Sequence, residues 1–206
     1  ATTSTGIDVT GTAVTDGVTV AGNLSVDGGT IKLDGNYPNG TNNVGMGDDA
    51  LTSITSGYSN VAIGMRALDV GTTANSNIAI GINSLGALIS GANNVAIGRD
   101  ALGSSTASRN TAVGYNALAA NTTATENTAI GYATLDAVTT GPRNTAVGYA
   151  SFSALTTSGG NTGIGYNTGS SATTGADNVF VGDRAGQAIT TGSSNAGIGK
   201  FAMYSQ

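Results

Sequence analysis

The feature that most constrains this chain is a short motif that recurs ten times along its 206 residues. In most copies the motif is an asparagine, a small or β-branched residue, an alanine or glycine, a β-branched residue and a glycine. The numbers of successive motif asparagines differ by 17, except for one step of 16 between Asn94 and Asn110. So short and regular a period predicts a repeat protein whose units are stabilised by their neighbours. The motif asparagines are Asn43, Asn60, Asn77, Asn94, Asn110, Asn127, Asn144, Asn161, Asn178 and Asn195.

A second pair of residues follows the same period, three positions after each motif glycine. It consists of a small residue and an apolar one. The apolar member is lost at Thr168-Gly169 and Ala185-Gly186 and returns at Ala202-Met203. Ten repeats therefore occupy residues 43–206, and the tenth is incomplete. The other pairs are Ala50-Leu51, Ala67-Leu68, Ser84-Leu85, Ala101-Leu102, Ala117-Leu118, Thr134-Leu135 and Ser151-Phe152.

The length of the repeat predicts an all-β fold. Helical repeats need about 33 residues or more, and Gly, Thr, Asn and Val are weak helix formers. In an extended Val61-Ala62-Ile63 segment, the two β-branched side chains point to one face and the alanine to the other. Turn-forming residues such as those at 72–76 separate the motifs. We therefore expect each repeat to be one coil of a parallel β-solenoid: a strand, a turn, a short second strand and a turn. Coils stacked ~4.8 Å apart would extend about 48 Å.

Stacking of the coils would place each motif residue above its equivalents. Asparagine amides in such a column can hydrogen-bond along it, as they do in other stacked strands. The glycine column permits a positive φ or a close backbone approach where the coil turns. We interpret both columns as structural rather than catalytic.

The composition argues against an enzyme. The chain has no histidine and no cysteine, which excludes an imidazole base, a thiolate nucleophile, a disulfide and an ordinary zinc site. Its net charge of -5 has the wrong sign for binding a phosphate backbone. No apolar run approaches the roughly 18 residues of a membrane-spanning helix. We therefore expect no catalytic residue, no cofactor, no metal, no nucleic-acid partner and no membrane insertion.

Two matches to functional motifs follow from the repeat itself. Residues 45–50 fit the dinucleotide-binding pattern G-x-G-x-x-A, but no strand–helix–strand unit surrounds them. Asp48 and Asp49 are adjacent carboxylates, and neighbours on a strand face opposite ways, which is poor geometry for shared acid–base chemistry. A solvated turn is the expected structure at this point.

The small number of large apolar side chains in each coil predicts self-association. A typical coil offers about three of them, for example Val61, Ile63 and Leu68, against the entropy of ordering a whole repeat. Burial shared between coils and between chains reduces this deficit. Thin faces such as Ala62 and Gly64 would suit close approach by a neighbouring chain, so we expect the chain to associate with copies of itself.

The repeat resembles a known family. Asn94-Val95-Ala96-Ile97-Gly98-Arg99-Asp100-Ala101-Leu102 and its nine relatives resemble the head repeats of trimeric autotransporter adhesins, which also occur in phage tail-fibre proteins. The resemblance covers residues 43–206 and implies a left-handed parallel β-roll in a homotrimer that binds surfaces. The repeat here is longer than the usual head repeat, so its connecting turns depart from the family's pattern.

Residues 1–42 have a different period and are expected to form a separate β-rich shaft or connector. Apolar-polar-apolar triads such as Val18-Thr19-Val20 and Ile31-Lys32-Leu33 alternate with glycines. Strands this short cannot bury their side chains within one chain, so an intertwined section is expected. Residues 22–35 resemble the shaft that precedes such repeats in phage tail fibres.

These resemblances imply a structural and adhesive segment of a phage tail fibre. The expected partners are copies of the chain itself, other tail or fibre proteins, and a host surface glycan or protein; the expected location is the virion tail. One alternative is the head of a bacterial trimeric autotransporter adhesin at the cell surface. Another is an ice-binding solenoid, suggested by regularly placed threonines, although the threonine column covers only four coils.

Two columns change together in four consecutive coils. Tyrosine follows the motif glycine there, and threonine replaces valine after the asparagine. Residues four apart on one extended strand share a face, so we expect the two columns to share a surface. The tyrosines are expected to form a stacked ladder or to fill a seam between chains, or alternatively to contact a host glycan. The tyrosines are Tyr115, Tyr132, Tyr149 and Tyr166, and the threonines are Thr111, Thr128, Thr145 and Thr162.

Overall fold

The computed structural model describes residues 35–37 and 40–204. The chain divides into two units, residues 1–33 and 34–206, and the described residues belong to the second. The expected shaft over residues 1–42 lies mostly outside the described residues. Its last part forms β1 (Gly35–Tyr37), which pairs in antiparallel fashion with β2 (Gly40–Met46). The hairpin therefore belongs to the same unit as the coils.

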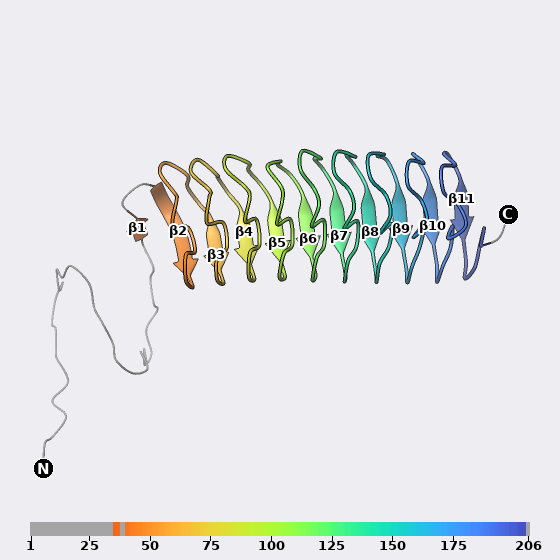
Figure 1. Ribbon diagram of the computed structural model, residues 1–206, viewed down its shortest axis with the longest axis horizontal. Coiled ribbons are helices and arrows are strands. Elements are labelled where there is room, and N and C mark those ends of the chain that lie inside the picture. Colours follow the sequence, from red (N-terminus) through yellow and green to blue (C-terminus); the bar gives the residue numbers. More distant parts are fainter. Residues whose placement is uncertain (1–34, 38–39, 205–206) are drawn as a thin grey trace, which may run out of the picture. The chain divides into compact units, whose positions relative to one another are not determined.

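The described chain is a parallel β-solenoid, as the period of the repeat predicted. Ten parallel strands, β2 to β11, lie side by side in chain order, and each pairs with the equivalent residues of the next (Figure 1). In a typical pair, Val61 lies opposite Ile78, Ala62 opposite Ala79 and Ile63 opposite Ile80. The remaining strands are β3 (Val61–Ile63), β4 (Ile78–Ile80), β5 (Val95–Ile97), β6 (Thr111–Val113), β7 (Thr128–Ile130), β8 (Thr145–Val147), β9 (Thr162–Ile164), β10 (Val179–Val181) and β11 (Ala196–Ile198).

The interior of each coil is lined by the small strand residue and by the apolar residue of the second pair. Ala62 and Leu68 are both completely buried, whereas Val61 and Ile63 on the opposite side of the strand are only half-buried. The expectation that the thin face receives a neighbouring chain is therefore wrong. The thin face turns inward because only a residue as small as alanine fits between the strand and the leucine of its own coil.

The expected second strand is absent from the described coils, each of which has one short strand followed by turns. The small-plus-apolar pair lies in these turns, where Arg66 and Leu68 adopt left-handed conformations with φ of 54° and 49°. Left-handed backbone is costly for residues other than glycine. Full burial of Leu68 and a hydrogen bond from its amide to the Ser84 carbonyl of the next coil offset this cost.

The motif glycines form a sharp corner at the end of each strand. Their φ lies between 117° and 138°, in a region that L side chains rarely adopt. A Cβ added to Gly131 would collide with the carbonyl group of Gly148 in the next coil. The glycine column thus serves both purposes expected of it, since it needs an unusual φ and a close backbone approach.

The single shorter repeat, which begins at Asn94, loses its residue in one turn. The amide nitrogen Nδ2 of Asn94 bonds the Ala107 carbonyl, 13 residues ahead, whereas the equivalent bond from Asn77 to Gly91 spans 14 residues. The missing residue therefore lies in the turn before Ala107, and the strands on either side keep their register.

Candidate functional site

The motif asparagines form a buried ladder along the coils. The side-chain oxygen of Asn60 accepts hydrogen bonds from both the backbone amide and the side-chain amide of Asn77, at 3.0 and 3.1 Å. The side-chain amide of Asn60 also donates to the carbonyl of Ala74 at 2.7 Å. Because each asparagine connects its own coil to its neighbours, the ladder satisfies polar groups that the turns bury.

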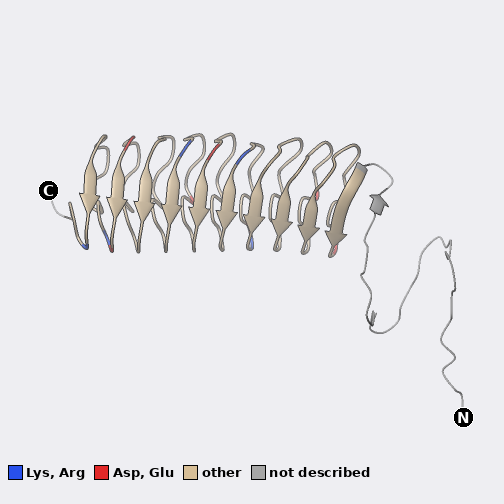
Figure 2. Cartoon of the chain, turned by 180° about the vertical axis from the view of Figure 1, so that it is seen from behind, with Lys and Arg blue, Asp and Glu red and all other residues tan. Residues whose placement is uncertain are grey.

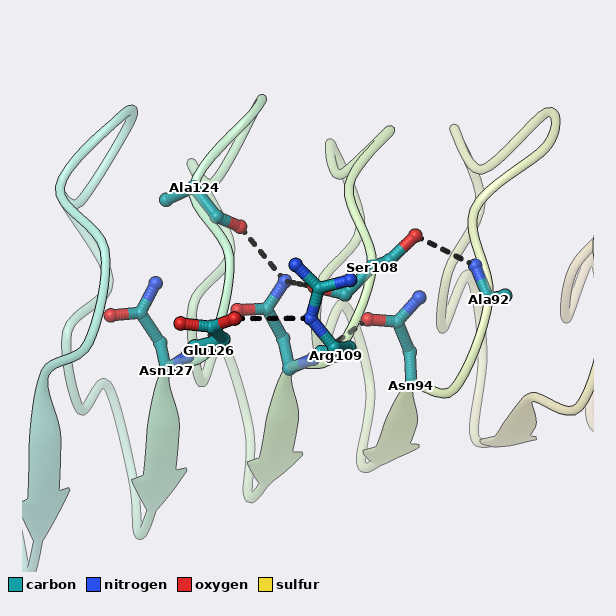
Figure 3. A network of polar contacts seen from close by, with 8 residues as sticks. Ala92, Asn94, Ser108, Arg109, Ala124, Glu126 and Asn127 are labelled. Carbon is teal, nitrogen blue, oxygen red and sulfur yellow. Dashed lines mark hydrogen bonds and ion pairs between the residues drawn. The ribbon is translucent and has the colours of Figure 1, made fainter.

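Figure 3 shows the ladder where the coil is shortest. The amide of Asn110 donates to the Asn94 side-chain oxygen at 2.9 Å, and its side chain donates to the Ala124 carbonyl at 2.8 Å. Outside it, Arg109 and Glu126 form an ion pair at 3.1 Å on exposed side chains. An exposed pair of this kind contributes little to stability.

The ladder has one weak point, at Asn127. Its side-chain nitrogen is buried and has no hydrogen-bond partner among the described residues, although its oxygen still accepts from Asn144. The carbonyl that the regular pattern would provide, that of Gly141, is instead bonded by Asn144. Gly141 precedes Pro142, which has no backbone N–H to donate at this position of the turn.

The second candidate feature is the outward side of the parallel strands, which we call the outer strand face. It carries no charged residue in any of the ten parallel strands, and the charged residues of the described chain lie in the turns (Figure 2). Several of its side chains are well exposed, with Ile130 at 40% and Ile164 at 43%. The face consists of one column with Val44, Val61, Ile78, Val95, Thr111, Thr128, Thr145, Thr162, Val179 and Ala196, and a second with Met46, Ile63, Ile80, Ile97, Val113, Ile130, Val147, Ile164, Val181 and Ile198.

The third candidate feature is a tyrosine ladder beside that face. Tyr115, Tyr132, Tyr149 and Tyr166 stack with ring centroids 5.1 to 5.3 Å apart and planes inclined by 4° to 17°. The four side chains are 39% to 49% exposed. This geometry matches the ladder that the sequence led us to expect, and offset stacking of this kind stabilises neighbouring coils.

Cationic side chains lie at both ends of the ladder. The guanidinium of Arg99 is 6.0 Å from the Tyr115 ring centroid, and that of Arg184 is 5.5 Å from the Tyr166 ring. Arg184 also lies 5.7 Å from the ring of Phe201, which extends the stack towards the last coil. Sequence reasoning missed these residues; the signal was present for Arg99, which occupies the same position after the motif glycine as the tyrosines.

The stack limits how a sugar could bind. A sugar ring normally packs against the face of an aromatic side chain, and here neighbouring tyrosines occupy the inner faces while the arginines approach the ends. The ladder therefore offers ring edges and hydroxyl groups to its surroundings. Glycan contact through these four tyrosines stays a prediction.

The threonine and tyrosine columns are not parts of one extended strand. Strand β6 ends at Val113, and Gly114 turns the backbone with a φ of 138° before Tyr115 begins. The expectation that Thr111 and Tyr115 share a strand face is therefore wrong. The threonine column lies before the glycine corner and the tyrosine column lies after it. The column of the outer strand face that contains Val113 and Ile130 runs between them.

The acidic residues of the described chain lie in its turns. Asp48 and Asp49 lie in an exposed turn, and no group of three potential metal-ligating residues occurs within residues 35–37 and 40–204. Burial raises the pKa of the Asp136 carboxyl above its ordinary value of 3.8, an effect that backbone amides partly offset. Because Asp136 stands without another acidic residue in its turn, this shift concerns stability.

Comparison of the chain with protein-family models, curated proteins and solved structures gives no match. No helix among the described residues is long and apolar enough to cross a membrane.

Proposed function

We propose that this chain is a segment of a homotrimeric, left-handed β-roll fibre, in which three copies cover one another's outer strand faces. The observation that carries the proposal is the exposed aliphatic surface of the parallel sheet. Parallel sheets normally have both faces covered, and large contiguous apolar surfaces mark sites of interaction. Within one copy the inner face is filled by Ala62, Leu68 and their equivalents, whereas the outer face has no cover.

The strand composition favours another copy of the chain as the cover. The outer strand face has no charged side chain to attract a charged partner, and its columns of Val and Ile are straight and regular. Closed rotational symmetry brings the same face of every copy towards a common axis, so each copy buries its face without leaving an open end. The threefold order and the left-handed winding come from the resemblance to head repeats of trimeric adhesins.

The biological role that we propose is that of a tail-fibre segment of a phage, a rod that displays or contributes to attachment to the host surface. A stacked solenoid suits this role because its length grows in proportion to the number of coils. The head of a bacterial surface adhesin is the alternative, and it would use the same trimeric rod. The tail fibre and the adhesin differ in where the chain is found, on a phage particle or on a bacterial cell surface.

The mass in solution tests the assembly. We expect light scattering to report the mass of three chains, which is three times 20.0 kDa. Replacing Ile97 by lysine places a charge in the outer strand face, so Ile97→Lys should shift the protein towards the 20.0 kDa monomer. Thr73→Lys is the matched control, because Thr73 is exposed in a turn away from the strands. A wild-type mass of one chain would contradict the trimer.

Attachment is tested separately, with a fluorescent label on the whole chain. We expect the labelled trimer to bind the surface of susceptible bacteria, and the Ile97→Lys variant to bind less because separate chains lose the avidity of three. If the protein kept the mass of an intact trimer but did not bind to cells, this segment would be a spacer without a host contact. That result would contradict the adhesive part of the proposal.

A further inference from the structure

The coils that carry threonine in the outer strand face are the same four that carry tyrosine after the glycine corner. The two substitutions begin together at Thr111 and Tyr115 and end together at Thr162 and Tyr166. In the coils before and after, the first position is aliphatic and the second is not tyrosine. Such matched boundaries indicate that the two columns contact the same binding partner. We call these eight residues the hydroxyl strip.

The strip's hydroxyl groups have no partner inside the described chain. Threonine hydroxyls elsewhere do bond within it: Thr122 and Thr139 donate to carbonyls of the next coil, and Thr134 donates to the Gly148 carbonyl. Among the described residues, no such bond involves a strand threonine or a tyrosine of the strip. Their side chains are half-buried or exposed, so these hydroxyl groups are available to a partner outside the chain.

A second copy of this chain fits that requirement. The strip's threonines belong to the outer strand face, which under the proposed function is covered by other copies, and its tyrosines lie beside that face. A threonine on a covered face needs a hydrogen-bond partner, because a buried unpaired hydroxyl is costly. Each copy brings equal numbers of threonine and tyrosine hydroxyls at the same four levels along the rod, so every donor can meet an acceptor.

We propose that the hydroxyl strip is a polar seam between copies, in which tyrosine hydroxyls of one chain hydrogen-bond strand threonines of its neighbour. This inference rests on the proposed trimer. Four pairs at four levels also favour one alignment of the chains. A shift by one coil would leave the tyrosine at one end of the strip opposite Val95 or Val179, and it would place the threonine at the other end opposite Asp183 or Arg99.

A double-mutant cycle tests the pairing, because it measures the coupling between two sets of side chains. One variant replaces the four threonines by valine, a second replaces the four tyrosines by phenylalanine, and a third combines both sets. Each substitution removes a hydroxyl and keeps the shape. We expect each single set to lower the denaturant midpoint of the trimer, and the combined variant to show no larger loss than the more affected single set. All three variants should keep the mass of three chains.

Matched controls separate the strip from other surface hydroxyls. Tyr58→Phe and Thr73→Val remove exposed hydroxyls away from the strip and should leave the midpoint unchanged. Additive losses in the cycle, or none, would overturn the pairing while the mass still supported the trimer. A wild-type mass of 20.0 kDa would instead overturn the trimer itself. Loss of cell attachment by the phenylalanine variant with an unchanged midpoint would assign the strip to a surface ligand and refute the seam.

Discussion

The first six coils and the last four fill the same interior in different ways. From Leu51 to Leu135, every coil has a leucine at the same position of the turn, and from Ala62 onward an alanine lies opposite it in the strand. After that point the leucine column becomes phenylalanine, glycine, glycine and methionine, at positions 152, 169, 186 and 203. The column nevertheless stays buried as far as position 186, and the strand register is continuous across the boundary between the two regions.

In the last four coils, large side chains cross into the space that smaller neighbours leave. The ring of Phe152 fills the site where a Cβ on Gly163 or Gly169 would lie, both of which belong to the next coil. Phe180 comes from the strand rather than the turn, and its ring covers Gly186 of its own coil. The two rings also contact each other, with centroids 5.8 Å apart. Volume is therefore conserved between the residues that meet, across two adjacent coils for Phe152 and within one coil for Phe180, as close packing requires.

The strongest test removes the ring on which the last coils depend. We expect Phe180→Ala to lower the free energy of unfolding by about 3–5 kcal/mol, because glycines on both sides cannot move to fill the cavity. Leu68→Ala in the regular region should cost about 2–5 kcal/mol by the same mechanism, and less than Phe180→Ala in a direct comparison. Chemical denaturation of both variants measures this, and equal costs would show that the two interiors respond alike.

Restoring the regular pattern tests whether the two regions are interchangeable. Gly169→Leu alone should cost about 1–3 kcal/mol or more, because the new side chain meets the Phe152 ring, with Cδ1 only 2.7 Å from the added Cβ. The backbone is not the obstacle, since φ is 55° at Gly169 and 49° at Leu68. The double variant Phe152→Leu, Gly169→Leu should recover most of the loss. Chemical denaturation of the three variants measures these costs. If the cost of the double variant equalled the sum of the two single costs, Phe152 would not be compensating for the small residue at position 169.

The sequence was sufficient to predict the strands and their stacking, because those depend on one short period and on two well-known side-chain patterns. It did not reveal which side of the strand faces inward. Val61 and Ile63 are the larger side chains and would ordinarily be assigned to the core, but a coil this narrow admits only Ala62 beside Leu68.

Other features depended on contacts between coils that a single repeat does not show. The pair Thr168-Gly169 appears in the sequence as a degenerate copy, and only the position of the Phe152 ring explains it. The turn conformation was missed for a related reason. A left-handed leucine is unfavourable locally and is stabilised only by burial and by the adjacent coil.

The asparagine ladder runs through both regions and should respond equally in each. Asn94→Ala and Asn178→Ala both leave buried amides and carbonyls without partners, which should cost about 1–3 kcal/mol for each unsatisfied group. Asn127→Ala should cost less, because its nitrogen already lacks a partner among the described residues and only the bonds accepted from Asn144 are lost. Unfolding midpoints of the three variants rank them, and a larger loss at Asn127 would contradict this order.

The smallest expected effect is at Asp136, in the last coil before the change of pattern, where the corresponding residue of the next coil is Ser153. Burial raises the pKa of the folded carboxyl above the 3.8 of an ordinary aspartate. The unfolded chain therefore releases this proton at a lower pH than the folded chain does. The group's favourable contribution is complete below pH 3.8 and is lost as the pH rises through the folded pKa.

Replacing this carboxyl by an amide should therefore remove the loss of folding stability that occurs as the pH rises. Asp136→Asn should be slightly more stable than wild type at neutral pH, and its unfolding midpoint should depend less steeply on pH above 3.8. Asp49→Asn, in an exposed turn, is the control and should leave the profile unchanged. Identical pH profiles for wild type and Asp136→Asn would show that the carboxyl is solvated after all, and that the boundary between the two regions is open to water.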